Sequence, residues 1–363
     1  MIIAFFLLTF FLICFYSFFL VDPSLTFINH PLWEKIRSFF INFGYYRRFE
    51  SVVVYVILLL LLFNFYFLMK DKKNMNIFKI ALIIASISLF SYPFLSRDFF
   101  NYLFDAKIFT FYGKNPYFHK PSDFLSDPWL RFMHWTHRTY PYGPVFLILT
   151  FIPSFFSFGK FVLAFLFFKI FWGIFYLLAV YFLEKLDKKI AFVFAFHPLI
   201  LVEGLINNHN DLIGLSLAII GIYFLLKNKN IFAYVFLIFS FGIKYISFPL
   251  LFLKKKNKNF NFLPLILIIF LLFYLSFFSE IQPWYFLILF AFLPFFPKII
   301  DNLNIFLLGL LLSYYPYLRF DFWNQKESLV LKHKIIIGFL FLNFIFYFLK
   351  LIILAKKIIF SKK

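Results

Sequence analysis

The sequence contains almost no cysteine and little charge. Its one cysteine, Cys14, lies inside an apolar run, which excludes a disulfide or a thiolate metal site within one chain. Only 14% of the 363 residues are charged, about half the share found in soluble domains. This scarcity of charge excludes a soluble enzyme, a disordered chain and a disulfide-stabilised secreted domain.

Acidic residues are the scarcer charged class. The chain has 16 Asp and Glu against 36 Lys and Arg, a formal net charge of +20. A charge of this sign can indicate a nucleic-acid partner, but the lysines here lie in short clusters between apolar runs. Such clusters are typical of cytoplasmic loops in membrane proteins, so we expect membrane lipid around the chain and no nucleic-acid partner.

Apolar residues dominate the composition instead. They make up 63% of the chain, against roughly 45–50% in an ordinary soluble domain. Successive apolar runs approach the ~20 residues that a helix needs to cross ~30 Å of hydrocarbon. The runs are 2–21, 51–69, 77–95, 144–158, 161–183, 190–206, 211–226, 231–253, 261–279, 284–297, 303–318 and 335–355. They predict an all-α polytopic membrane protein with about 11–13 transmembrane helices. The first run lacks a basic start and a cleavage site, so we expect it to remain as an anchor.

The lysine clusters predict the orientation, because cytoplasmic loops carry an excess of Lys and Arg. These clusters lie at 70–73, 185–189, 227–229, 254–258 and 356–363. If every apolar run crossed the membrane once, the cluster at 185–189 would lie outside. At least one run must therefore behave differently.

Two apolar runs are the candidates. The run 144–158 is broken by Pro153 and would be only about 22 Å long as a helix, so we expect it to lie at the outer interface. The run 231–253 has lysines at both ends and is interrupted by Gly242 and Lys244, so we expect a hairpin of two short helices. With both changes the N- and C-termini and all lysine clusters are cytoplasmic. The stretches then expected outside are 22–50, 96–143, 207–210, 280–283 and 319–334.

Several unusual motifs gather in or beside these outer stretches. In chain order they are the Asp-containing stretch from Ser96 to Lys107, Gly113-Lys114-Asn115-Pro116-Tyr117, Tyr140-Pro141-Tyr142-Gly143-Pro144, His209-Asn210-Asp211, Lys244-Tyr245 with the later Pro249, and Pro283-Trp284-Tyr285. The set resembles the GT-C glycosyltransferases that take a sugar from a polyprenyl phosphate. It is most similar to the bacterial polyprenol-phosphate-mannose-dependent mannosyltransferases, over about residues 77–297, with departures at Arg97 and Ala106.

The resemblance implies a GT-C-like bundle with outer-face juxtamembrane helices. It divides the chain into an N-terminal two-helix membrane extension (1–76), a catalytic membrane core (77–297) with the outer loop 96–143, and C-terminal helices with a basic cytoplasmic tail (298–363). It also implies a multi-pass enzyme of the plasma (inner) membrane with an extracytoplasmic active site. The expected partners are a polyprenyl-phosphate donor of a hexose such as mannose, and a glycan or lipid acceptor.

Asp98, at the mouth of an apolar run, is the expected catalytic base. Inverting transfer to a hydroxyl needs one carboxylate to take the acceptor's proton, and positive charge or a metal at the leaving phosphate. The alternative role for Asp98 is a helix cap. Asp105 is the second catalytic candidate. Its alternatives are to orient a Lys or Arg side chain, to bind sugar hydroxyls, or to pair locally with Arg97 or Lys107.

A polar turn supplies the next candidates. His209, Asn210 and Asp211 are expected to contact the donor phosphate or sugar. His209 and Asp211 could do so through a divalent ion such as Mg or Mn, although two side chains are few for a metal site. A simple polar turn is the alternative. Glu203 lies within an apolar run, where a carboxylate costs about 2.5–3.5 kcal/mol, so it should face a cavity or pair with a base.

Lys244 is expected to bind the donor phosphate at the hairpin tip, beside Tyr245. A lone ammonium at that depth needs an anion or water, and the alternative is a side chain that snorkels to the interface. The next candidates for the phosphate are Lys107, Arg131 and Arg138. The remaining donor-site candidates are Gln282 and the aromatic residues Tyr142, Trp284 and Tyr285, and anchoring at the membrane surface is the alternative for the aromatic ones.

Two other functions stay open. A transporter or flippase for lipid-linked saccharides would spread charged residues through both leaflets and have repeated halves, whereas the motifs here gather on one face and no halves repeat. An O-antigen polymerase or ligase would be another outer-face enzyme, with a lipid-diphosphate donor and a large loop later in the chain. The leading prediction is therefore the glycosyltransferase.

Overall fold

The computed structural model describes residues 1–25, 27–70, 72, 74–255, 259–321 and 325–361, from 354 onward by the backbone alone. Five lysines of the predicted cytoplasmic clusters, namely Lys73, Lys256, Lys258, Lys362 and Lys363, lie outside the described residues. Within the described ranges the chain is helical and contains no strand. The predicted all-α class is therefore confirmed.

Four helices are long and apolar enough to cross a membrane, among the residues described. They are α1 (Ile2–Tyr16) with the turn η1 (Ser17–Leu20), α3 (Arg48–Lys70), α7 (Phe161–Glu184) and α14 (Lys326–Ser361). A fifth candidate span is broken: α8 (Lys188–Phe196) and η5 (Ile200–Ile206) meet at 62°. The chain is thus a polytopic membrane bundle, and the total of about 11–13 crossings stays a prediction.

Shorter helices fill the rest of the bundle and its end. The apolar ones are α4 (Ile77–Ser88), α6 (Pro144–Phe156), α9 (Asn210–Leu226), α10 (Asn230–Ile243), α11 (Phe262–Phe278), η7 (Pro283–Phe292) and α12 (Asn304–Leu312). The others are α2 (Pro31–Ile41), η2 (Asn42–Tyr46), α5 (Asp98–Thr110), η3 (Pro121–Asp123), η4 (Pro128–Phe132), η6 (Tyr245–Phe252) and α13 (Tyr315–Phe320). Buried α9 forms the centre of the bundle and packs against α7, α10 and η7.

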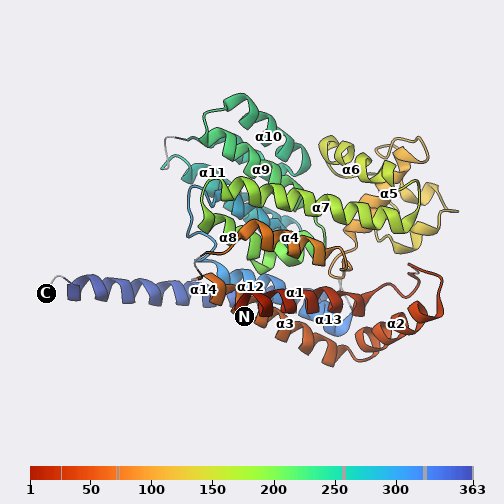
Figure 1. Ribbon diagram of the computed structural model, residues 1–363, viewed down its shortest axis with the longest axis horizontal. Coiled ribbons are helices and arrows are strands. Elements are labelled where there is room, and N and C mark those ends of the chain that lie inside the picture. The colour runs from red at the N-terminus through yellow and green to blue at the C-terminus, as the bar shows by residue number, and fades with distance from the viewer. Residues whose placement is uncertain (26, 71, 73, 256–258, 322–324, 362–363) are drawn as a thin grey trace.

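Contacts between distant segments group the helix ends into two opposite faces. At the polar-loop face the ion pairs are Asp22–Arg97, Arg48–Asp321 and Glu280–Lys332. At the lysine face they are the ion pair Lys70–Asp301 and the hydrogen bond from Lys255 to Asn228. In Figure 1 the polar-loop face lies at the right, with α2, α5 and α6, and the C-terminus lies at the far left. The polar stretches thus share one face, whereas the side of the membrane that it occupies stays a prediction.

The run 231–253 forms the expected hairpin. α10 rises from the lysine face, and η6 returns beside it and contacts α9 and α11. The two ends of the hairpin meet where Lys255 Nζ lies 2.8 Å from Asn228 Oδ1. At the tip, Lys244 Nζ lies 2.8 Å from Asp211 Oδ2, at the start of α9. The hairpin therefore carries Lys244 to the polar-loop side of the bundle and brings the chain back.

α6 packs along part of α7 and does not lie flat across the end of the bundle as expected for an interfacial helix. Phe146 contacts Trp172 near the middle of α7, and Phe156 contacts Phe167 near its start. α6 thus runs from mid-bundle toward the polar-loop face. Its first turn rests on the hairpin tip, where a Cβ on Gly143 would clash with the carbonyl oxygen of Gly242.

Candidate active site

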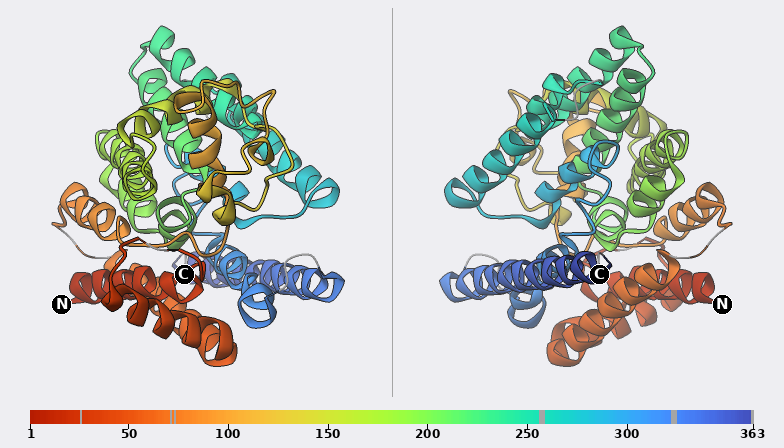
Figure 2. Two further views of the ribbon diagram at one scale, coloured as in Figure 1. Left: turned by 90° about the vertical axis from the view of Figure 1, so that its right-hand side faces the viewer. Right: turned by 90° about the vertical axis from the view of Figure 1, so that its left-hand side faces the viewer.

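A cavity of about 680 Å³ lies at the polar-loop face, the end that Figure 2 (left) turns toward the viewer. Its walls come from five separate segments: 95–98, 134–142, the hairpin tip, 279–285 and 317–321. It brings together Asp98, Tyr142, Lys244, Gln282, Trp284 and Tyr285 of the predicted site. Residues nearly two hundred positions apart in the chain therefore share one hollow.

Asp98 is the first residue of α5 and one of three carboxylates that line the cavity. Its backbone N–H donates to Ser96 Oγ at 3.1 Å, which fixes the turn into the helix. Its side chain is 17% exposed, and its Oδ2 lies 3.7 Å from His209 Nδ1. Asp98 thus starts the helix without capping it, because the N-cap is Arg97 and no side-chain cap hydrogen bond forms, and its carboxylate lines the cavity.

His209 lies directly behind Asp98 and is fully buried. Its ring stacks on Trp284 with centroids 3.8 Å apart and planes 15° from parallel. Its other nitrogen, Nε2, lies 3.3 Å from Oε2 of Glu203, which is also fully buried. Glu203 therefore has the basic neighbour that its cost in an apolar run predicted. Burial lowers the pKa of His209 to about 4, so its imidazole is neutral near pH 7.

Two side chains of α7 hold the turn that carries His209. Lys169 Nζ donates to the carbonyl of Ile206 and to Ser91 Oγ, each at 2.8 Å. Trp172 Nε1 donates to the carbonyl of His209 at 3.0 Å. Sequence reasoning missed both residues, although a lone lysine inside an apolar run was the signal that singled out Lys244.

Lys244 already has an anionic partner in the protein. The anion that a buried ammonium was expected to need is supplied by the carboxylate of Asp211, so binding of the donor phosphate by Lys244 stays a prediction. Its ammonium lies 5.8 Å from the ring centroids of both Tyr142 and Tyr285, and it still lines the cavity. Asp211 thus anchors a cation that faces the hollow between two aromatic rings.

Arg138 is the cavity cation without a carboxylate partner in the described part of the chain. It stacks on Trp135, with its guanidinium carbon 4.4 Å from the ring centroid. By contrast, Arg97 lies 3.7 Å from Asp22. His134, Trp135, Tyr317 and Asp321 also line the cavity and were missed. The dense His, Trp and Arg content of 134–138 in a polar loop was the available signal.

Five predicted site residues lie outside the cavity lining, as far as the chain is described: His209 and Asp211, which stand behind it, and Asp105, Tyr245 and Asn210. Asp105 is buried farther along α5, and neither suggested local pair forms, since Lys107 binds Asp127 and Arg97 binds Asp22. Burial raises the pKa of Asp105 to about 8. Tyr245 is 62% exposed beyond the hairpin tip, and Asn210 is buried at the start of α9.

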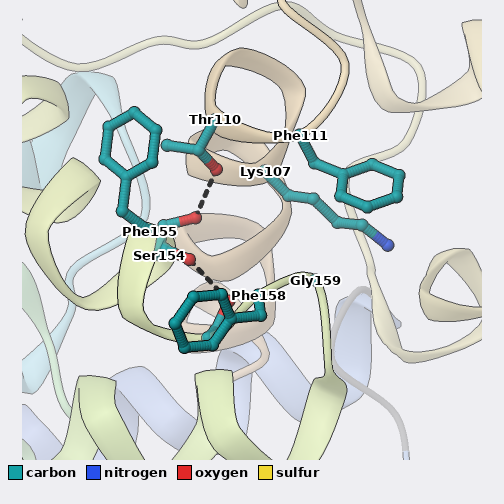
Figure 3. A pocket seen from close by; sticks show the side chains of 8 residues that line it. Lys107, Thr110, Phe111, Ser154, Phe155, Phe158 and Gly159 are labelled. Carbon is teal, nitrogen blue, oxygen red and sulfur yellow. Dashed lines mark hydrogen bonds between the residues drawn. The ribbon is translucent and has the colours of Figure 1, made fainter.

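A second hollow of about 270 Å³ lies between the ends of α5 and α6 (Figure 3). Its hydroxyl groups bond within the protein: Thr110 Oγ1 lies 2.7 Å from Ser154 Oγ, and Ser157 Oγ donates to the carbonyl of Ser154. The Lys107 ammonium turns away toward Asp127 and the ring of Trp129. The hydroxyl groups of this hollow are therefore already hydrogen-bonded within the protein. Lys107 and Arg131, which bonds Pro128 in its own turn, are absent from the lining of the larger cavity.

The residues present do not fit a divalent metal. Among the described residues, no three His, Cys, Asp or Glu side chains converge closely enough to hold an ion. Of the two suggested ligands, Asp211 is bound by the Lys244 ammonium, and His209 lies between two carboxylates against Trp284. No metal ion is therefore assigned a chemical role at this site.

Comparison with known families gives one match. The family model described as "Alpha-(1->6)-mannopyranosyltransferase, N-terminal domain" matches residues 11–254, more than half of the chain. The match takes in the first two apolar runs, which the resemblance seen in the motifs did not cover, and it includes Asp98, His209 and Lys244. No curated protein and no solved structure matches the chain.

Proposed function

The chain belongs to the alpha-(1->6)-mannopyranosyltransferase family, and from that premise we propose that it moves a mannosyl group from a polyprenyl-phosphate donor to a hydroxyl of a glycan or lipid acceptor. As a mannosyltransferase it uses a sugar donor and an acceptor. The polyprenyl phosphate, the inverting mechanism, the GT-C type and the extracytoplasmic side are the proposed parts. The expected membrane is the plasma membrane, with the lysine face in the cytoplasm.

One observation carries the proposal: carboxylates and cations line the same cavity at one end of a membrane bundle. Of its three carboxylates, Glu280 and Asp321 pair with Lys332 and Arg48, whereas Asp98 has no Lys or Arg partner among the described residues. Asp98 faces the cavity, and Lys244 and Arg138 line it too. Transfer of a sugar from a phosphate requires this combination, because a proton must leave the acceptor while negative charge develops on the departing phosphate. A donor with a lipid tail would reach such a cavity with its phosphate near headgroup depth.

The reaction then needs no second carboxylate. The acceptor oxygen attacks the anomeric carbon of mannose as the bond from that carbon to the phosphate oxygen breaks. Asp98 accepts the proton of the attacking hydroxyl. Lys244 and Arg138 stabilise the charge on the leaving phosphate, and Arg138 offers the bidentate geometry that phosphate favours. Trp284, Tyr285 and Tyr142 line the hollow and would bound the sugar, with Gln282 as a hydrogen-bonding side chain.

The transporter alternative is less well supported by the distribution of charge. A flippase pathway would require charged groups through both leaflets, whereas the charged side chains of the cavity all come from the polar-loop face. An O-antigen-type polymerase or ligase would use a lipid diphosphate. A comparison of polyprenyl-phosphate mannose with a lipid-diphosphate donor separates that class from the proposed one.

The direct test replaces the proposed base. Asp98→Asn should lower turnover of purified protein by about 10²–10⁴-fold, while expression and donor binding stay close to the parent, because the amide keeps the size of the side chain. Asp123→Asn, in the same outer loop and outside the cavity, is the matched control. Near-parental turnover of Asp98→Asn in a product assay by mass spectrometry would remove Asp98 as the base.

A further inference from the structure

The side chains behind the cavity wall form a continuous line from the surface into the bundle. Asp98 is partly accessible, His209 is fully buried behind it, and Glu203 is fully buried behind His209. The two nitrogens of one imidazole thus face two different carboxylates, at 3.7 Å and 3.3 Å. Neither contact meets hydrogen-bond geometry in this structure, and both nitrogens are buried without a hydrogen bond to any described residue, so each is free to bond the carboxylate that it faces.

We propose that His209, supported by Glu203, is the positioning residue that orients the Asp98 carboxylate toward the acceptor hydroxyl. The inference rests on the proposed role of Asp98 as the base. His209 touches no reacting atom in this arrangement, since Asp98 stands between it and the cavity. It acts by directing its Nδ1–H at Oδ2 of Asp98, which leaves the other carboxylate oxygen to accept the proton.

The hydrogens available to the His209 imidazole and the Glu203 carboxyl group permit one assignment of donor and acceptor between them. A neutral imidazole that donates from Nδ1 must accept at Nε2, so the carboxyl group of Glu203 has to be the donor at that contact. Oε2 of Glu203 lies 3.3 Å from both Asn207 Nδ2 and His209 Nε2, so a hydroxyl at this oxygen could donate to the imidazole while it accepts from the amide. A protonated glutamic acid is also far less costly than a carboxylate in a buried apolar site.

The surroundings hold the imidazole in place. Trp284 covers one face of the ring, and the indole of Trp172 and the ammonium of Lys169 fix the backbone on which it stands. A rigid support of this kind matters because a displacement of about 1 Å in a catalytic group can cost ~10²-fold in rate. His209 is therefore held rigidly enough to orient the Asp98 carboxylate.

The first variant removes the nitrogens and keeps the stacking. His209→Phe should lower kcat by about 10²-fold and leave donor affinity within a few-fold of the parent. His197→Phe is the matched control: His197 is equally buried and ring-packed, but its Nε2 bonds Asn304, far from the cavity in the chain. The control should keep kcat near the parental value when both variants are purified as folded protein.

The second comparison tests the direction of the proton. Glu203→Gln keeps a donor for Nε2 and should retain most of the turnover, whereas Glu203→Leu should lose about as much as His209→Phe. Parental turnover of Glu203→Leu, or equal losses for both Glu203 variants, would overturn the inference. This pair also carries the test if His209→Phe fails to fold.

A double variant separates positioning from mere structure. If His209 acts only through Asp98, Asp98→Asn combined with His209→Phe should be no slower than Asp98→Asn alone. If His209→Phe merely damaged the structure, its loss would add to that of Asp98→Asn, and the double variant would be about 10²-fold slower than Asp98→Asn alone. That result would overturn the inference. An active Asp98→Asn variant would contradict the proposed base, which is a different outcome and distinguishable from this one.

Discussion

At the scale of single residues, Lys244 shows how a counter-ion changes the meaning of a buried charge. A lone lysine in an apolar run was expected to need an anion or water, and the donor phosphate was the anion proposed for it. In the structure the anion is Asp211, and the pair lies at the cavity edge. A cation that is held but not fully enclosed can still attract a phosphate, and its geometry is fixed in advance.

Replacement of Lys244 tests this role. Lys244→Met should lower turnover by about 10²-fold, more than it lowers donor affinity, and Lys244→Arg should keep part of the activity because the charge survives. Lys244→Met leaves the Asp211 carboxylate buried without its partner, so this variant should also lower the yield of folded protein. Combining it with Asp211→Asn should restore that yield but not the turnover. Lys160→Met, at an exposed site, is the control. A parental rate for Lys244→Met would leave Arg138 as the main phosphate ligand.

Asp105 makes a prediction about pH. Its pKa is raised by burial from 3.8 to about 8, so between about pH 4 and pH 8 the unfolded chain loses this proton while the folded chain keeps it. The free energy of unfolding must therefore fall across that window. Asp105→Asn cannot ionise, so its apparent melting temperature in detergent should exceed that of the parent by more at pH 8 than at pH 5. Asp123→Asn should lack this trend, and an equal difference at both pH values would contradict the assignment.

At the scale of elements, the hairpin and α6 together occupy the place of a crossing helix. α10 has 14 residues and α6 has 13, each shorter than the ~20 needed to span hydrocarbon. They meet where Gly143 lies against the carbonyl of Gly242. The close contact explains glycine at position 143 of the Tyr-Pro-x-Gly-Pro motif by steric fit.

Substitution at this contact should be costly. In Gly143→Ala the added methyl meets a backbone carbonyl that cannot rotate away, so we expect destabilisation of about 1–3 kcal/mol and reduced turnover as the hairpin tip shifts Lys244. Gly338→Ala is the matched control, because a Cβ there meets nothing within 4 Å. The comparison requires melting temperature and product formation for both variants. Equal stability of the two would contradict the close packing.

Several elements could be predicted from the sequence because one-dimensional signals determine them. The lysines flanking 231–253 predicted the hairpin, and the outer motifs predicted six residues of the cavity wall. Pro153 and the short length of its run predicted a short helix, but not that this helix packs along α7 instead of lying at the outer interface. Other features depend on how distant segments meet. Neither the pairing of Lys244 with Asp211 nor the approach of Lys169 to the turn before His209 leaves a trace in local sequence. The same is true of the burial of Asp105, which follows from packing around α5.

At the scale of the whole molecule, the two faces differ in the charge that they present. The polar-loop face holds the cavity, whereas the described lysine face carries ion pairs and hydrogen bonds that tie α3 to the segment after η7 and α9 to the hairpin. If cytoplasmic loops are the basic ones, the cavity opens on the opposite side of the membrane. This orientation can be measured without an activity assay.

Single cysteines in a Cys14→Ser background should report the orientation. In intact cells an impermeant maleimide should label Asn115→Cys and Lys326→Cys, on the polar-loop face, but not Lys188→Cys, Asn228→Cys or Lys254→Cys until the cells are opened. All five positions are exposed in the structure, so a failure to react reports the membrane side. Labelling of Lys254→Cys from outside, with Asn228→Cys protected, would contradict the hairpin.

The contact between Gly143 and Gly242 also has a consequence for how the protein is made. An insertion machinery that reads hydrophobic length one segment at a time has no reason to leave α6 in the membrane as a crossing, nor to halt α10 halfway. α6 and α10 become stable only against each other and against α7 and α9, which are synthesised after α6 and before α10. The contact between Gly143 and Gly242 must therefore form after α7 and α9 are in place. The cavity, which depends on the position of Lys244, is then completed late in biogenesis.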